Sequence, residues 1–453
     1  MMKLKFIKSQ IKQLVIFSLL IGLIACKKET QDIVIAPNDF HKAVDKITSI
    51  MVHDIFSPPV ASRIYAYPNI AAYEVICQNS DKYNTLSGQL TDFKPVPKPL
   101  SGEKINYKLA ALVAYFDVGK ELIFSEDRII IYRDSLYGIW KKLDEDTFEV
   151  SKNYGLQVAE HIKDWIATDN YNETRTMPKF SVLTENVSRW QPTPPDYMAG
   201  IEPHWSKIRP FVINSATQFK PKKHPEFSLD KGTDFYKELM EVYNIGKKIK
   251  QGGDDSEEVE IAQFWDCNPY VSTHKGHLMF ATKKITPGAH WIGICKIASK
   301  KENIDFDRTI FAYTKTSIAI ADAFISCWDE KYRSNLIRPE TIINQHLDEK
   351  WTPVLQTPPF PEYTSGHSVV SGAASIALTD IFGDNFKFDD DTEVPYGLPV
   401  RSFISFNKAA DEAAVSRLYG GIHYRAAIDV GLKQGRDLGK FVINNLEMKK
   451  GSI

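Results

Sequence analysis

Three short segments near the C-terminus carry side chains of the types that could bind and activate an oxyanion. The first runs from Lys331 to Arg338, the second is Ser365-Gly366-His367, and the third runs from Arg417 to His423. Guanidinium groups bind the oxygens of a tetrahedral or trigonal-bipyramidal anion through paired hydrogen bonds, and a lysine adds a point charge. A serine and a glycine at a helix start offer a hydroxyl and backbone N–H groups. The two histidines could then divide ligation or nucleophilic attack from proton transfer.

The spacing predicts how these residues come together. Lys331 and Arg338 are seven residues apart, which is two turns of a helix, so both side chains are expected to point the same way. Gly420-Gly421 is expected to end one helix and turn the chain, which would bring His423 back toward Arg417. A basic pair on a helix is usually a solvated face, and an isolated Ser-Gly-His is common. The three segments together are a much stronger indication than any one of them.

The three segments resemble the signature of the type 2 phosphatidic acid phosphatase and vanadium-dependent haloperoxidase superfamily. That signature is a Lys, six residues and Arg-Pro, then Ser-Gly-His, then Ser-Arg, five residues and His. The chain matches all of it, although Thr364 replaces the proline that usually precedes Ser-Gly-His. The N-terminal part of the chain, which includes the segment Ser57-Pro58-Pro59, resembles that of the larger bacterial haloperoxidase-type members of this superfamily.

The resemblance implies a role for each matching residue. The oxygens of the bound vanadate or phosphate would be held by Lys331, Arg338, Ser365, Gly366 and Arg417. His423 would be the vanadium ligand of a peroxidase, or the nucleophile of a phosphatase that forms a phosphohistidine. His367 would be the general acid or base in either reaction.

Residues outside the signature are expected to complete the site. Trp328 and Phe360 resemble the aromatic side of the pocket in the fungal chloroperoxidase branch, where the halide is thought to approach. The alternatives are that Trp328 is a core residue and that Phe360 anchors a loop. Asp266 is a candidate second carboxylate that pairs with one of the arginines. His277 and His290 could line the cavity, but core or loop roles are favoured for both.

The sequence departs from the family at one position near the final histidine. Many members have an aspartate four residues after it, where this chain has Ala427. The group that orients the second ring nitrogen of His423 is therefore not identified, and a backbone group would suffice.

We expect a vanadate-dependent haloperoxidase that oxidises a halide with hydrogen peroxide. The alternative is an exported acid phosphatase that hydrolyses small phosphate esters at the same residues without vanadate. A third possibility is a non-catalytic surface lipoprotein that binds a glycan or a partner protein. Each of these is compatible with the composition. The 453 residues carry 56 basic and 57 acidic side chains, a balance that argues against nucleic-acid binding.

The N-terminus has the features of a bacterial lipoprotein signal. Lysines precede an apolar run from Leu14 to Ala25, and the sequence Leu23-Ile24-Ala25-Cys26 resembles a lipobox. We therefore expect a signal peptide over residues 1–25, a lipid on Cys26 and a polar tether over residues 26–39. The protein would lie in the bacterial cell envelope, in the periplasm or on the outer membrane, and contact the membrane only through this anchor. The other cysteines, Cys77, Cys267, Cys295 and Cys327, are expected to be buried apolar side chains.

Helical periodicity dominates the remaining chain, so we expect an all-α fold with two packed helical halves and long Pro-rich loops. The halves are expected over residues 40–250 and 251–447, with the catalytic residues in the second. The segment 309–329 should be a central helix whose charges, Lys315, Asp322 and Asp329, share one stripe while its other faces are buried. The segment 170–225 is expected to be a long irregular connection.

Overall fold

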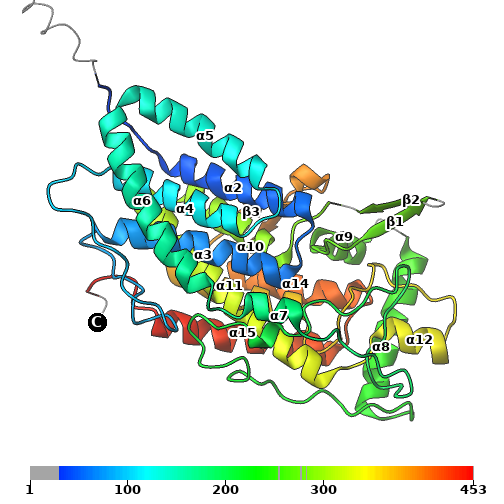
Figure 1. Ribbon diagram of the computed structural model, residues 1–453. Coiled ribbons are helices and arrows are strands. Elements are labelled where there is room, and N and C mark those ends of the chain that lie inside the picture. Colours follow the sequence, from blue (N-terminus) through cyan, green and yellow to red (C-terminus); the bar gives the residue numbers. More distant parts are fainter. Residues whose placement is uncertain (1–29, 254–255, 276–277, 282, 452–453) are drawn as a thin grey trace, which may run out of the picture.

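The computed structural model describes residues 30–253, 256–275, 278–281 and 283–451 of the chain. It is mostly helical, and the predicted all-α fold is confirmed (Figure 1). The first half contains α2 (Pro37–Asp54), α3 (Pro58–Cys77), α4 (Tyr107–Glu121), α5 (Glu126–Leu143), α6 (Glu145–Ile166), α7 (Tyr171–Thr176), η1 (Trp205–Lys207) and α8 (Asp234–Gly252). The second half contains α9 (Glu257–Phe264), α10 (Pro287–Lys301), α11 (Phe306–Ser334), α12 (Pro339–His346), α13 (Gly366–Phe382), η2 (Val394–Tyr396), α14 (Phe406–Tyr419) and α15 (Arg425–Asn445).

Two short antiparallel hairpins complete the described secondary structure. Strands β1 (Ser272–Lys275) and β2 (Leu278–Ala281) pair with Ser272 opposite Ala281. Strands β3 (Phe388–Asp390) and β4 (Arg401–Phe403) pair with Phe388 opposite Phe403. The first hairpin extends beside α9, away from the helical body (Figure 1).

Some of the sequence predictions fall outside the described residues. The signal peptide over residues 1–25, Cys26 and His277 all lie there. The predicted tether is only partly described, and its second part is not a tether: Ile33 and Ile35 are buried, and α2 begins at Pro37. Burial of apolar side chains therefore draws the segment from Ile33 onward into the fold.

Helix α11 runs through the middle of the protein and packs against α3, α10, α13 and α15 (Figure 1). Asp305 caps its N-terminus by accepting a hydrogen bond of 2.7 Å from the backbone N–H of Arg308. By length and composition it is the one helix in the described chain that could cross a membrane, but that stretch is entirely buried by protein. The helix is thus the core element that the sequence predicts.

The charged stripe of α11 differs from the expectation, because two of its three residues are also buried. Lys315 forms an ion pair with Asp380 at 2.6 Å. Asp322 accepts hydrogen bonds of 2.7 to 3.0 Å from three consecutive backbone N–H groups, those of residues 211–213. Burial raises the pKa of Asp322 to about 6, and the three N–H groups offset part of that cost. This carboxylate fixes the long irregular connection, which contains only α7 and η1 between α6 and α8.

Close contact between α13 and α15 positions the start of α13. A Cβ atom on Gly435 would lie 1.9 Å from the carbonyl oxygen of Val369, so only glycine fits at this crossing. Gly431 lies less close to the N-terminal end of α13, where a Cβ atom would lie 3.2 Å from Ser368 Cβ and 3.3 Å from the carbonyl oxygen of Ser365. The glycines of α15 therefore determine how closely α15 approaches α13, and with it the position of the Ser-Gly-His segment at the start of α13.

A second, smaller core joins α8 and α12 to the C-terminal helices. Phe235 and Leu239 of α8 pack there with Ile343 of α12 and with Tyr424 and Ile428 near the start of α15. A helix from before residue 250 thus packs against helices from after it, and the division of the chain into two halves at residue 250 stays a prediction.

Candidate active site

The three predicted segments meet around one cavity. Its lining includes Gly366, His367, Arg417 and His423 together with an aromatic and proline-rich wall, and it encloses about 460 Å³ including its open mouth. Lys331 and Arg338 lie directly behind this lining, because Arg338 contacts His423 and a Cβ atom on Gly366 would lie 3.9 Å from the Lys331 side chain. The structure therefore brings together every residue of the predicted oxyanion site.

Lys331 and Arg338 converge by a different route from the predicted one. Helix α11 ends at Ser334, and Asn335 adopts a left-handed conformation with φ of 49°. Arg338 is the N-cap residue of the next helix, α12, so the two residues do not share a helix face. Both side chains instead lie over the Phe360 ring, with the Lys331 nitrogen 4.8 Å and the Arg338 guanidinium carbon 5.0 Å from its centroid.

Backbone carbonyls hold the two cations in place. Lys331 Nζ donates to the carbonyl oxygens of Pro361 and Glu362, both at 3.1 Å. Arg338 donates from Nε to the Phe360 carbonyl at 3.0 Å and from Nη1 to the Ile422 carbonyl at 2.8 Å. The carbonyls fix the side-chain geometry without cancelling the charges.

Arg417 is the third buried cation, and it lies near the end of α14. Its Nη1 lies 3.2 Å from His367 Nε2, and its Nη2 donates to the Ala262 carbonyl at 3.3 Å. Gly420 ends α14 as its C-cap, and Gly421 has a φ of 76°, a conformation that suits glycine. The predicted glycine turn from Arg417 to His423 is thus confirmed.

The site has an excess of buried positive charge. Burial lowers the pKa of Lys331 to about 7 and that of Arg338 to about 10, because each ammonium or guanidinium has lost its water. Within the described residues, none of Lys331, Arg338 and Arg417 forms an ion pair with a carboxylate. Arg338 Nη2 and Arg417 Nε are also buried without a hydrogen-bond partner. Such donors are costly to bury unless an acceptor arrives, so the site is suited to an anion.

Glu362 is the group that orients His423, and the sequence analysis missed it. Its Oε1 atom accepts hydrogen bonds from His423 Nδ1 at 2.8 Å and from the Tyr424 backbone N–H at 2.9 Å. With the proton on Nδ1, the lone pair of Nε2 faces Arg338 Nη1, 3.1 Å away. Glu362 lies in the loop before Ser-Gly-His, and no motif spacing relates it to His423. The sequence around Glu362 therefore carries no local signal that identifies it.

Burial and neighbouring charges act on both partners of this pair. Burial raises the pKa of Glu362 to about 8, although Arg338 and the Tyr424 N–H oppose the shift. Burial and the nearby Arg338 and Lys331 charges hold the pKa of His423 well below its usual value. The neutral imidazole is therefore the favoured form, and this is the form that can ligate a metal centre.

His367 occupies the first turn of α13, on the other side of the cavity. Ser365 is the N-cap residue of this helix, and its hydroxyl accepts from the Ser368 N–H at 3.3 Å. The carbonyl of Ala427 accepts from the Ser365 N–H at 3.0 Å. The residue that replaces the usual aspartate thus fixes the anion-binding turn through its backbone. Burial and Arg417 hold the pKa of His367 well below its usual value.

Trp328 and Phe360 form the aromatic side of the cavity. Their ring centroids are 5.0 Å apart, and both side chains line the space next to Gly366 and His367. The indole nitrogen of Trp328 donates to the Ile201 carbonyl at 3.4 Å. Phe360 also lies under the two cations, so it is part of the site as well as a loop anchor.

Asp266 pairs with a lysine and not with an arginine as predicted, whereas His290 has the core role that the sequence favoured. Asp266 lines the cavity, but its ion pair is with Lys284, while its charge still acts on Arg417. His290 lies on α10, a helix that the sequence analysis did not predict, and is fully buried between carboxylates. It does not line the cavity.

The chain is similar to proteins of one known family. The family described as VCPO second helical-bundle domain matches residues 311–450, which contain the three segments. The crystal structure of the first bacterial vanadium-dependent iodoperoxidase is 63% identical to the chain, with a TM-score of 0.90; the match covers 94% of this chain and 100% of that one. The holo form of a bacterial vanadium-dependent chloroperoxidase is 18% identical, with a TM-score of 0.65, and the match covers 86% of this chain and 93% of that one, a likeness of fold. No curated protein sequence matches.

Proposed function

We propose, from the premise that the chain belongs to the vanadium-dependent haloperoxidases, that it oxidises iodide with hydrogen peroxide at the cavity between α11, α13 and α14. Vanadate is the cofactor, and hydrogen peroxide and a halide are the substrates of this class of enzyme. The choice of iodide rests on the 63% identity with the bacterial iodoperoxidase over nearly the whole chain.

The observation that carries the proposal is the set of uncompensated buried cations. Lys331, Arg338 and Arg417 are held by carbonyl groups and a histidine, and two guanidinium nitrogens have no partner. A tetrahedral oxyanion such as vanadate supplies the missing acceptors and neutralises the charge. The residues present therefore fit the cofactor.

Each residue has a role that follows from its contacts. His423 would hold the vanadium through Nε2, because Glu362 keeps the proton on Nδ1. Lys331, Arg338 and Arg417, with the N–H of Gly366 and the hydroxyl of Ser365, would hold the oxygens. When bound, vanadate supplies the Lewis-acid chemistry that makes hydrogen peroxide an oxidant of halide.

His367 is the residue placed to move protons. His367 is partly exposed to the cavity, whereas His423 is buried. The neutral form of His367 accepts a proton from the entering peroxide. Arg417 disfavours the imidazolium, so the proton is passed on readily. Trp328 and Phe360 exclude water from the aromatic side, where a large, weakly hydrated halide fits better than water does.

The test is reconstitution of the purified chain without its N-terminal segment. Iodide oxidation should appear only when vanadate is added, and His423→Ala should abolish it. Chloride and bromide are assayed in parallel, because equal rates with all three halides would contradict the choice of iodide. Hydrolysis of a phosphate monoester that vanadate inhibits, without halide oxidation, would instead establish the phosphatase alternative.

We also propose that the enzyme is exported as a lipoprotein of the cell envelope. The support is the apolar run that ends in Leu23-Ile24-Ala25-Cys26. Metabolic labelling with a fatty acid should mark the expressed chain, and Cys26→Ser should remove both the label and the membrane fraction. Unchanged membrane association of the variant would contradict the anchor.

A further inference from the structure

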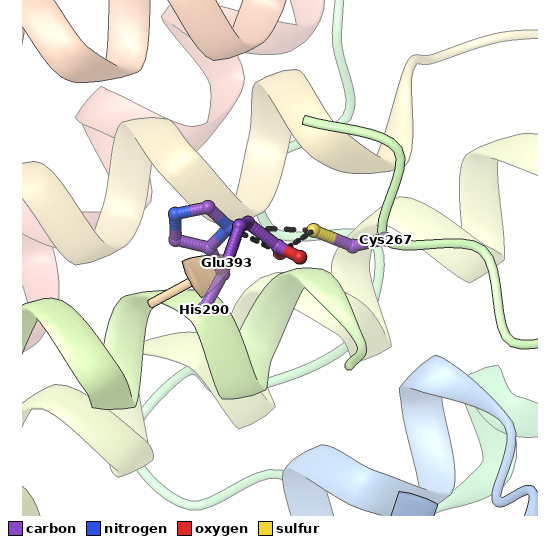
Figure 2. A group of neighbouring side chains, drawn as sticks. All are labelled: Cys267, His290 and Glu393. Atoms are coloured by element: carbon purple, nitrogen blue, oxygen red, sulfur yellow. Dashed lines mark hydrogen bonds and ion pairs between the residues drawn. The ribbon is translucent and has the colours of Figure 1, made fainter. Parts of the chain in front are cut away.

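A buried cluster next to the cavity has the composition of a transition-metal site. Cys267 follows α9, His290 lies on α10 and Glu393 precedes η2, so three separate segments meet there (Figure 2). All three residues are buried, with 0% exposure for the His290 side chain. The cluster shares only Cys267 with the lining of the cavity described above.

The three ligand atoms are spaced as on one face of a coordination tetrahedron. Cys267 Sγ lies 3.4 Å from His290 Nδ1 and 3.7 Å from Glu393 Oε1, and the nitrogen lies 3.2 Å from that oxygen. Zinc bonds of about 2.0 to 2.3 Å at tetrahedral angles give ligand separations of about 3.4 to 3.6 Å. An ion can therefore be accommodated with shifts of a few tenths of an ångström at most.

The far side of the imidazole is arranged as it is in metal-binding histidines. His290 Nε2 lies 2.8 Å from Asp390 Oδ2, a bond that would keep the proton on Nε2 and leave Nδ1 to face the cysteine and the glutamate as a ligand once a metal ion replaces the Nδ1 proton. Thr392 supports Asp390 by donating to its other oxygen at 2.7 Å. Trp265 stacks on the imidazole, with ring centroids 4.4 Å apart, and fixes the plane of the ring.

We propose that Cys267, His290 and Glu393 bind a divalent zinc ion, with Asp390 as the carboxylate that orients His290. A thiolate, an imidazole and a carboxylate form the mixed donor set that zinc prefers among the common biological cations. Two buried carboxylates beside one imidazole also leave the cluster with negative charge that a divalent cation offsets. Three protein ligands leave a fourth position for water.

The ion would serve the neighbouring vanadate site by fixing one of its walls. Cys267 is preceded by Trp265 and Asp266, and the backbone of Trp265 forms a hydrogen bond with His367. Binding at Cys267 would tie this segment to α10 and to the loop that carries Glu393. The inference rests on the cluster alone and does not depend on the proposed halide oxidation.

The experiment measures zinc on the purified full chain after dialysis against a buffer containing zinc. We expect about one equivalent of zinc per chain, a loss of affinity of at least about 100-fold in Cys267→Ser, and a loss of about 10- to 100-fold in Asp390→Asn. Cys295→Ser is the matched control, because Cys295 is also a buried free cysteine of the described chain but lies outside the cluster. The control should keep its zinc.

A second measurement protects the test against variants that do not fold. Cobalt bound to the wild-type chain should give the thiolate-to-metal charge-transfer band that a cysteine ligand produces. Absence of this band, absence of stoichiometric zinc in the wild type, or equal zinc in the wild type and Cys267→Ser would each overturn the proposal, leaving the cluster as a set of ion pairs. Vanadium content is measured in the same samples, so a failure of the vanadate site is recognised separately.

Discussion

Replacing Glu362 by glutamine tests whether this carboxylate controls vanadate binding through His423. In the parent chain one oxygen of Glu362 accepts from both His423 Nδ1 and the Tyr424 N–H, which keeps His423 Nε2 free of a proton. A glutamine can turn its amide nitrogen toward Nδ1 and so favour the tautomer with the proton on Nε2, which cannot ligate vanadium. Even with the amide oxygen in place, the imidazole loses the carboxylate that raises its basicity.

The expected effect is a loss of vanadate affinity of about 10- to 100-fold, or about 1.4 to 2.7 kcal/mol. Above pH 8, where Glu362 is ionised, electrostatics alone predicts the opposite sign, because removing its negative charge beside three cations would strengthen their attraction for an anion. The assay is equilibrium dialysis of the variant against orthovanadate, with recovery of halide oxidation as a second readout. Turnover at saturating vanadate separates weaker binding from slower chemistry.

Glu330→Gln provides the matched control. Glu330 is also a buried carboxylate close to the site, but it pairs with Arg333 and Ser334 and does not contact His423. Its neutralisation should leave vanadate affinity within about threefold of the parent value, because Arg333 offsets its charge and it does not contact the vanadium ligand. If Glu362→Gln bound vanadate as tightly as the parent or more tightly, tautomer control by Glu362 would be refuted.

Three further predictions concern proton transfer, pH and packing. His367→Ala should lower turnover by about 10²- to 10⁴-fold while vanadate affinity stays within a few fold, and a collapse of affinity in dialysis would show that His367 is a ligand. Burial lowers the pKa of His41 to about 4, so between pH 6.5 and 4 the unfolded chain binds a proton that the folded chain does not. The stability of the parent therefore falls as the pH falls through this range, by up to about 3 kcal/mol. Melting temperatures of His41→Gln should approach those of the parent at pH 4.5, and a difference that stays constant with pH would contradict the pKa shift. Gly435→Ala should lower stability by about 1 to 3 kcal/mol and weaken vanadate binding, because α13 must move away from α15. The control is Gly138→Ala on exposed α5, where the added methyl group meets no neighbouring atom, and this variant should be slightly more stable than the parent.

The sequence predicted the residues of the site better than the way they are brought together. The Lys331, Ser-Gly-His and Arg417 segments were identified from residue types and order, because an oxyanion needs a specific set of donors. The prediction that Lys331 and Arg338 share a helix face was wrong, because Asn335, in a left-handed conformation, ends the helix between them. Side chains of such length reach a common point from several backbone paths, so their spacing did not identify the backbone.

The features that the sequence missed depend on contacts between distant segments. Helix α10 is buried around most of its circumference, so it lacks the amphipathic period that reveals a helix. Glu362 becomes functional only because the turn after α14 places His423 beside it, 61 residues along the chain. Unlike α11, whose charges at seven-residue spacing mark it as a helix, neither α10 nor a partner supplied by another loop leaves a local pattern.

The partners of the buried arginines separate structural from functional positions in this protein. Arg63 donates to Asp169 at 2.6 Å and stacks over the Tyr171 ring, so its charge is neutralised within the fold. The guanidinium groups of Arg338 and Arg417 instead contact backbone carbonyl oxygens and histidine nitrogens. These contacts orient the guanidinium groups and leave their positive charges available to an anion. A carboxylate in place of those carbonyls would stabilise the empty site and compete with the incoming anion. The fold therefore keeps its vanadate site receptive by leaving these two arginines without a direct ion pair to a carboxylate, and cofactor binding supplies the charge that folding alone does not.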